Sequence, residues 1–400
     1  MPPVGPVGDT TQGDSYNREQ LTASASGFRG EFCRGDARFG SRAGAAPTAE
    51  YSISTLANTG VLPHPQPPRY TSPMPGKRKF EEQLAALDAL RQQSPEAAIE
   101  PLRKALTNRN NFVAAKAADL IREFDLRQLT PELLVAFDRF FADPVKSDPQ
   151  CWAKNAISRA LAAFDHHDPA VFLRGMKHIQ NEPAWGGSSD SAATLRATCA
   201  VALVQCRSLA DAELLTHLIE LFADKEKSVR AAAIQAVANV GSSSSVLLLR
   251  LKATIADDEP EVLGACYSGI LELEGAKTIP WISRFLAVGD DAAAEAALAL
   301  AGTHSPEAFA ALQERFAHES DPWFLSVLLS AIALTRQDAA MEFLFELVRA
   351  ESLHAEAAIE AILRAGPPAE VTGRLQQLVA GSPRLAQVFA AHSESSSPRR

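Results

Sequence analysis

Several features that would restrict the function of this 400-residue chain are scarce or missing. Cysteine is limited to five residues, an odd number whose spacing fits no disulfide framework and no zinc ligand set. Four of them lie in predicted helices, where a free cysteine packs as a small hydrophobic residue. No uncharged apolar run approaches the ~18 residues of a membrane span, and the first 30 residues lack the apolar core of a secretory signal. We therefore expect a cytoplasmic protein without a membrane segment.

Positive charge is also scarce in most of the chain, whose formal net charge is -9. Residues 1–79 carry nine Lys and Arg against six Asp and Glu, whereas residues 80–392 carry 28 against 41. A segment as acidic as the second is poorly suited to a phosphate backbone. We therefore expect a protein partner and no nucleic acid.

The composition divides the chain into three parts. Residues 1–79 are rich in Gly, Pro, Ser, Thr and Ala and show no periodicity, which predicts a disordered segment. The sequence from Met74 also resembles a natural N-terminus, so two hypotheses stay open: a genuine tail, or an upstream region wrongly included in the reading frame. Residues 80–390 form the predicted folded array, and residues 391–400 form a second disordered tail.

From Phe80 onward the apolar spacing predicts helices and no strands. One apolar stripe with a spacing of three or four residues recurs along the chain, as in Val229, Ala233, Val237 and Val240, where Gly241 is a predicted C-cap. The third position of each copy serves as an anchor. The anchors are residues 121, 161, 203, 237, 270, 298, 332 and 362, with steps of 28 to 42 residues. Such a period indicates a helical repeat array.

Bulkier helices such as 131–143, 211–224, 305–319 and 338–350 alternate with these small-residue helices, so each unit is a helical hairpin that must stack on its neighbours. An Asp stands 13 residues before four successive anchors, and a basic residue stands seven before three of them. The resulting pairs are Asp148 with Lys154, Asp190 with Arg196, and Asp224 with Arg230. Farther along, Leu263, Asp291, Leu325 and Ala355 occupy the basic position, where we expect Phe-rich packing instead.

This pattern, with "SVRAAAIQAVANVG" behind it, resembles the HEAT repeat family, in particular its short bacterial form and the repeats of bilin lyases. The resemblance covers residues 80–390 and is most specific over 148–275. It implies an all-α fold, a right-handed α-solenoid of eight or nine hairpins, behind a disordered N-terminal segment. It also implies that the six residues Asp148, Lys154, Asp190, Arg196, Asp224 and Arg230 form a structural ladder in which each basic residue bonds the turns between helices.

No catalytic, cofactor-binding or metal-binding residue can be assigned from the sequence. In "FDHHDP" (164–169) the four candidate ligands are adjacent and do not converge on one ion from a helix, so we interpret Asp168 and Pro169 as the start of a helix. Some HEAT-like arrays are di-iron hydroxylases with His-Glu pairs on successive repeats. Here the one pair, His318-Glu319, cannot build such a site.

A DNA-binding surface would need a stripe of basic residues along the second helices. The residues two before and two after each anchor are a mixture of polar and small residues and form no such stripe. For a protein partner we select five contact residues: Arg159, Trp185, Gln205, Gln235 and Asn239. Trp185 lies in the longest connector, "NEPAWGGSSDS" (181–191), and we expect it to fold back onto its own repeat. Trp152, Trp281 and Trp323 are expected in the core.

These observations favour a non-catalytic scaffold whose concave surface, lined by the second helix of each unit, binds a protein. The alternative is an enzyme on the same scaffold, either a bilin-type lyase or an alkylbase DNA glycosylase. A deep pocket with converging acidic and aromatic side chains would favour the enzyme, and a shallow continuous face would favour the scaffold. The oligomeric state does not follow from the sequence.

Overall fold

The computed structural model describes residues 75–395, which belong to one compact unit. Most of the predicted segment 1–79, the proposed start at Met74 and residues 396–400 lie outside the described residues. The helices before residue 205 are α1 (Pro75–Ala89), α2 (Pro95–Leu106), α3 (Asn111–Glu123), α4 (Thr130–Arg139), α5 (Pro144–Ser147), α6 (Trp152–Ala163), α7 (Pro169–Met176) and α8 (Ala193–Leu203).

The remaining helices are α9 (Asp211–Ile219), α10 (Lys227–Val240), α11 (Ser243–Ile255), α12 (Pro260–Glu274), α13 (Ile279–Ser283), α14 (Asp291–Ala301), α15 (Pro306–Ala317), α16 (Pro322–Leu334), α17 (Asp338–Arg349), α18 (Ala355–Arg364), α19 (Ala369–Val379) and α20 (Pro383–Ser395). Short 3₁₀ turns extend several of them. The described part is thus mostly helical, as predicted, and none of its helices is long and apolar enough to cross a membrane.

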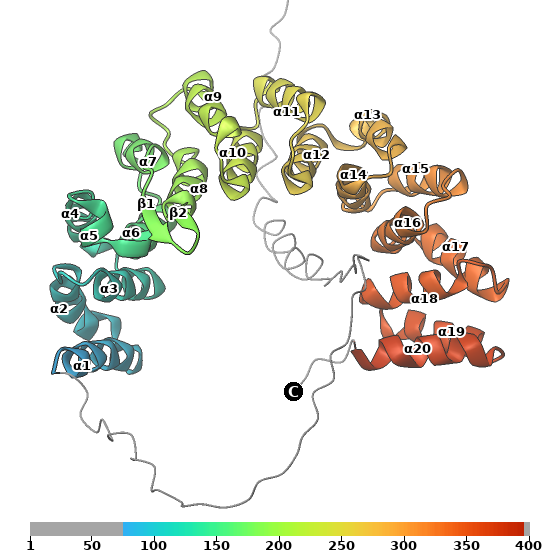
Figure 1. Ribbon diagram of the computed structural model, residues 1–400, viewed down its shortest axis with the longest axis horizontal. Helices are drawn as coiled ribbons and strands as arrows, with labels where there is room; N and C mark the ends of the chain where they lie inside the picture. The colour runs from blue at the N-terminus through green and yellow to red at the C-terminus, as the bar shows by residue number, and fades with distance from the viewer. Residues whose placement is uncertain (1–74, 396–400) are drawn as a thin grey trace, which may run out of the picture. The chain divides into compact units, whose positions relative to one another are not determined.

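The helices of this unit form two rows (Figure 1). The inner row consists of α1, α3, α6, α8, α10, α12, α14, α16, α18 and α20, and each of these helices packs against the next in the row. The outer row consists of α2, α4, α7, α9, α11, α13, α15, α17 and α19, and each packs against the inner helix that follows it. The second helix of each hairpin therefore has neighbours on both sides, which explains why it needs a closely packing, alanine-rich surface.

The predicted apolar stripe is buried in the inner row. Val229, Ala233 and Val237 of α10 are fully buried, and Gly241 ends this helix with a left-handed φ of 74°. A glycine adopts that conformation without the steric cost of a Cβ. Seven of the eight anchor residues are buried, which confirms the register there. The exception is Leu298 of α14, where the fully buried position is Ala297, so the predicted anchor is displaced by one residue.

Several other predictions were wrong. The prediction of no strands after Phe80 fails within the longest connector, residues 181–191, where β1 (Asn181–Ala184) and β2 (Gly187–Asp190) form an antiparallel hairpin. Cys151 and Cys206 are buried but lie in a 3₁₀ turn and just after α8, not in α-helices. Trp152 and Trp323 are 47% and 48% exposed instead of lying in the core. Both occupy the first turn of an inner helix, and the ring of Trp152 packs edge-on against Phe112 of the neighbouring inner helix, with 4.9 Å between the centroids.

Candidate functional site: the inner helices and the edge that holds them

Asp148 and Lys154 form an ion pair with no solvent exposure on either side chain. The Nζ atom of Lys154 lies 3.0 Å from a carboxylate oxygen of Asp148 and donates a hydrogen bond to the carbonyl of Phe140. Asp148 also accepts hydrogen bonds from the backbone N–H groups of Ala153 and Lys154 and from the side-chain amide of Asn111 on the preceding inner helix. A buried carboxylate requires several such partners. One of these partners, Asn111, belongs to the preceding unit, so this hydrogen bond joins two units.

Arg196 of α8 joins two successive turns. Its guanidinium lies 2.6 Å from Asp190 in its own unit and donates two hydrogen bonds, of 2.8 and 3.0 Å, to Asp224 of the next unit. It also donates to the carbonyl of His178. Burial opposes the charged form, but the hydrogen bonds that the guanidinium donates to the two aspartates raise the pKa of Arg196 above its usual value.

Arg230 of α10 repeats this geometry one unit later. Its guanidinium donates 2.9 and 2.7 Å hydrogen bonds to Asp257, and it contacts the backbone carbonyl of Asp224 instead of its carboxylate. Lys252 of the outer helix α11 is a second cation for Asp257, at 2.7 Å. Burial alone would raise the pKa of Asp257, yet hydrogen bonds from Arg230 and Lys252 hold it at about 2. The six predicted ladder residues thus lie along one edge of the array. Asp257 and Lys252 extend this series.

The C-terminal units are joined differently. Leu263, Leu325 and Ala355, which occupy the basic position of the pattern, are buried apolar residues there. Aromatic contacts cross from unit to unit in their place. The ring of Phe343 on α17 lies 6.2 Å from Phe309 and 5.7 Å from Phe316, both on α15, measured between centroids. This arrangement agrees with the predicted Phe-rich packing.

The β-hairpin is held firmly at its base. Glu182 is buried, and its carboxylate accepts hydrogen bonds from the backbone of Gln150, the amide of Gln180 and the hydroxyl of Ser191. Although burial opposes it, these donors lower the pKa of Glu182. The tip is formed by Trp185 and Gly186, with a positive φ at the glycine. Trp185 is fully exposed, so the expectation that it folds back onto its repeat was wrong.

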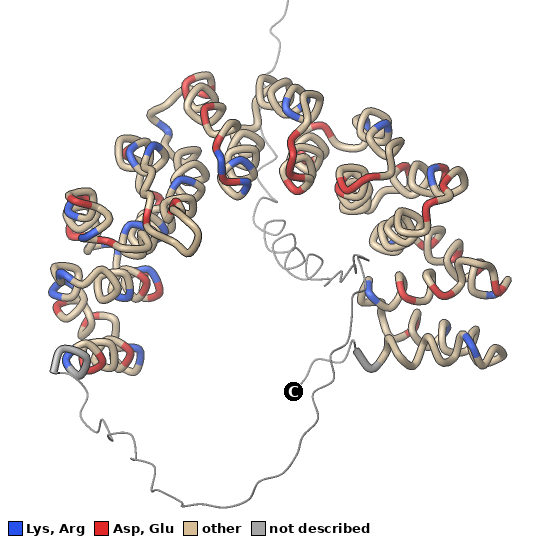
Figure 2. The backbone as a smooth tube through the Cα atoms, viewed as in Figure 1, with Lys and Arg blue, Asp and Glu red and all other residues tan. Residues whose placement is uncertain are grey.

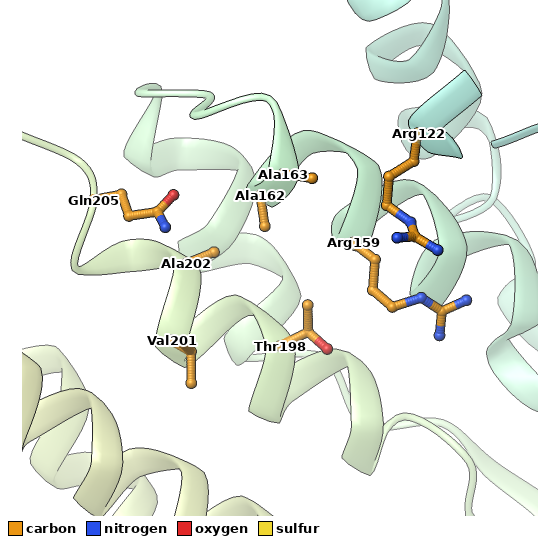
Figure 3. A pocket seen from close by; sticks show the side chains of 8 residues that line it. All are labelled: Arg122, Arg159, Ala162, Ala163, Thr198, Val201, Ala202 and Gln205. Carbon is orange, nitrogen blue, oxygen red and sulfur yellow. The ribbon is translucent and has the colours of Figure 1, made fainter. Parts of the chain in front are cut away.

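The inner face carries the other residues selected for partner binding. A shallow hollow of about 430 Å³ lies between α3, α6 and α8 (Figure 3). Arg122 and Arg159 line one end of it, and both approach Asp119, at 3.8 and 3.1 Å. Gln205 lines the other end, and small side chains form the floor: Ala162, Ala163, Thr198, Val201 and Ala202. Gln235 and Asn239 lie on α10, exposed, and hydrogen-bond to each other at 3.1 Å.

The charge of the inner row changes sign along the array (Figure 2). Helices α6 and α8 contain three basic and no acidic side chains. Helices α12, α14 and α16 contain five acidic and no basic side chains. A second hollow, of about 580 Å³, lies between α18 and α20. Two of the carboxylates that line it are in ion pairs, Glu356 with Arg384 and Glu360 with Arg364.

Asp168 and Glu319, two of the remaining chemical candidates, have structural partners. Asp168 caps α7 by accepting from the N–H of Ala170, as predicted. Glu319 accepts from the N–H groups of Ser320 and Asp321 and pairs with Arg315, so its carboxylate closes a turn. Within residues 75–395 no group of three or more His, Cys, Asp and Glu could hold a metal ion. Burial raises the pKa of the Cys151 thiol to about 12, away from that of a nucleophile.

Sequence reasoning missed several residues of this region. Gln180 and Glu182 lie in the hairpin, which occurs in one unit, so no repeat comparison could reveal them. Lys252 lies five residues before Asp257, on the outer helix, whereas the pattern was sought on the inner helices. A search for any basic residue near each recurring Asp would have found it.

Comparisons with known proteins leave the function open. No family model matches the chain, and the search of curated proteins finds no match. Among solved structures, an engineered protein is 16% identical with a TM-score of 0.28, covering 79% of this chain and 95% of the other. Human deoxyhypusine hydroxylase in complex with glycerol is 15% identical with a TM-score of 0.21, covering 80% and 100%. A second engineered protein is 20% identical with a TM-score of 0.17, covering 74% and 95%. Likeness at these scores carries no argument about activity.

Proposed function

We propose that this chain is a non-catalytic scaffold that binds a segment of another protein along its inner helices. The observation that supports this function most is the inner face itself, which runs through ten consecutive packed helices and carries exposed, small and polar side chains. The hollow between α3, α6 and α8 is shallow and has no acidic or aromatic side chain in its lining. An extended face with few obligatory polar partners suits a polypeptide better than a small substrate.

The finer architecture belongs to the same proposal. We take the array to be a right-handed solenoid of eight or nine HEAT-like hairpins, on the strength of the repeated Asp and Arg positions and the stacked hairpins. The acidic helices α12 and α14 would meet basic side chains of the partner, and Arg122 and Arg159 would meet an acidic group. The proposal also holds that the partner is a protein and not a membrane or a nucleic acid. It places the chain in the cytoplasm.

Site-specific photo-cross-linking in native cells tests the proposal. A photoreactive amino acid is placed at Gln205 or Gln235 on the inner face, and at Val135, which is 70% exposed on the outer helix α4, as the control. We expect the same protein to be cross-linked from both inner positions and not from position 135. The Ala163→Arg substitution should abolish both adducts, because a long charged side chain would fill the hollow.

Two results would contradict the scaffold function. One is an equal adduct from the inner and outer positions. The other is the recovery of a pigment or of damaged DNA from the inner face of the purified protein, which would favour the lyase or the glycosylase.

A further inference from the structure

The outer helix α11 exposes a stripe of large aliphatic side chains. Leu247, Leu251 and Ile255 are 69%, 57% and 68% exposed, and their spacing of four residues places them on one helix face. The opposite face of α11 is buried against the array through Leu249 and Ala253. Single exposed apolar residues are common, but a contiguous stripe on a soluble surface marks an interaction site.

The charges on the two sides of this stripe have opposite signs. On the α9 side, Glu213 and Glu220 are exposed, and no ion pair joins either of them to a described residue. On the α13 side, the side chain of Lys277 is 73% exposed and lies 3.5 Å from the less exposed Glu274, and Arg284 is exposed above the ring of Trp281, at 4.4 Å. Figure 2 shows acidic positions on α9 and basic positions in the short turns on either side of α13. Across the outer row, the surface therefore changes from negative at α9 to apolar at α11 and to positive beside α13.

We propose that α11 is the contact helix of a homodimer, in which it packs parallel to α11 of a second copy. A two-fold axis along the helix direction exchanges the two flanks, so the acidic flank of each copy faces the basic flank of the other. An axis across the helix would place like charges opposite each other. The surface is therefore complementary to itself in one orientation. The partner that fits it is a second copy of this chain.

The acidic and basic residues of the two flanks also lie at matching levels along the helix axes. Glu213 lies in the first turn of α9 and Lys277 just before α13, so both lie at the same end of the outer row. Glu220 and Arg284 follow the ends of the same two helices. The parallel arrangement therefore forms Glu213–Lys277 and Glu220–Arg284 pairs across the contact. One helix and its flanks lie at the small end of specific interfaces, which predicts a dimer that dissociates in the micromolar range.

Sedimentation velocity of the full chain across micromolar to submillimolar concentrations tests this contact. We expect a monomer–dimer equilibrium, and we expect Leu251→Glu to weaken it at least tenfold because a carboxylate would be buried opposite its own copy. Val135→Glu is the matched control, since it places the same charge on an exposed apolar position of another outer helix, and it should leave the equilibrium unchanged. Circular dichroism confirms that both variants are folded.

A charge exchange tests the orientation. Glu213→Lys and Lys277→Glu should each weaken the dimer, because each opposes like charges, and the double variant should restore it. A chain that stays monomeric at every concentration would overturn the proposal, as would dimerisation unaffected by Leu251→Glu. Growth into larger assemblies without a limit would also overturn it, and failure of the double variant to recover would overturn the parallel arrangement.

Discussion

Successive units are joined by different kinds of buried contact in the two halves of the array. Between residues 148 and 257 the units are joined by buried carboxylates paired with Lys154, Arg196 and Arg230. Between residues 286 and 390 the buried contacts between units are aromatic rings and aliphatic side chains, with Phe343 in contact with two phenylalanines of the preceding unit. The ion pairs that cross units there, Glu342 with Arg374 and Glu356 with Arg384, are exposed. Buried ion pairs are directional and strongly penalise the loss of one partner, whereas apolar contacts tolerate substitution in proportion to the volume removed.

The position of the hairpin accounts for part of this difference. Inserting β1 and β2 between α7 and α8 lengthens the turn, and the lengthened turn carries Glu182, Gln180 and Asp190 into the edge of the array. A long connection needs its backbone groups satisfied, and polar side chains supply the partners. The turns of the C-terminal half are shorter and their backbone groups find partners locally, as at Glu319, so apolar residues can occupy the same edge.

The largest effect is expected for Lys154→Ala. Removing this cation leaves the fully buried Asp148 without a counter-charge, which should destabilise the array by about 3–5 kcal/mol. The midpoint of urea unfolding and the amide exchange of α6 measure this loss. Lys146→Ala is the control, because Lys146 pairs with Asp143 at the exposed surface and should change stability by less than about 1 kcal/mol. Similar values for the two variants would contradict the role of the buried pair.

A somewhat smaller effect is expected for Phe343→Ala in the other half. Truncating this ring removes its contacts with Phe309 and Phe316 and should cost about 2–4 kcal/mol. Amide exchange of α15 and α17 should accelerate, and the change should be the same at neutral and acidic pH, because no charge is involved. A pH-dependent change would show that the C-terminal half also depends on ion pairs.

An effect of about 2 kcal/mol is expected from the protonation of Asp257. Its folded pKa of about 2 lies below the ordinary value of 3.8, so its stabilisation is present above about pH 4 and is lost as the pH falls towards 2. Acid unfolding monitored by circular dichroism should therefore shift in Asp257→Asn, which removes this pH-dependent step and is less stable at neutral pH. An acid transition identical to that of the unmodified chain would exclude Asp257 as a contributor.

The smallest effect on stability is expected for Trp185→Ala. The side chain is fully exposed, so its removal should change the free energy of unfolding by less than about 0.5 kcal/mol. Glu182→Ala at the base of the same hairpin should cost more, because four hydrogen-bond donors would lose their acceptor. Differential scanning calorimetry of the two variants compares them. A large loss of stability in Trp185→Ala would mean that the tip packs on the array.

The repeat could be predicted because its cause is local. A helix that must pack against two neighbours needs small residues at a regular spacing, and Val229, Ala233 and Val237 display that spacing in the sequence. The hairpin could not be predicted, because it occurs once and its stability comes from Glu182, whose partners lie up to 32 residues away. The exposure of Trp152 also escaped prediction, since the sequence does not show how much of a side chain in the first turn of a helix its neighbours cover. The proposed partner contacts, Arg159, Gln205, Gln235 and Asn239, lie on the exposed inner face, and their role stays a prediction.

Hydrogen exchange of the whole chain, measured peptide by peptide as the pH is lowered from about 5 to about 2, tests the contrast between the halves most directly. After correction for intrinsic exchange rates, we expect α8 and α10 to lose protection first, because protonation of Asp190 and Asp257 weakens their pairs with Arg196 and Arg230. Helices α15, α16 and α17 should keep their protection over the same range. Simultaneous loss in both halves, or earlier loss in the C-terminal helices, would contradict the assignment of ion pairs to one half and apolar contacts to the other.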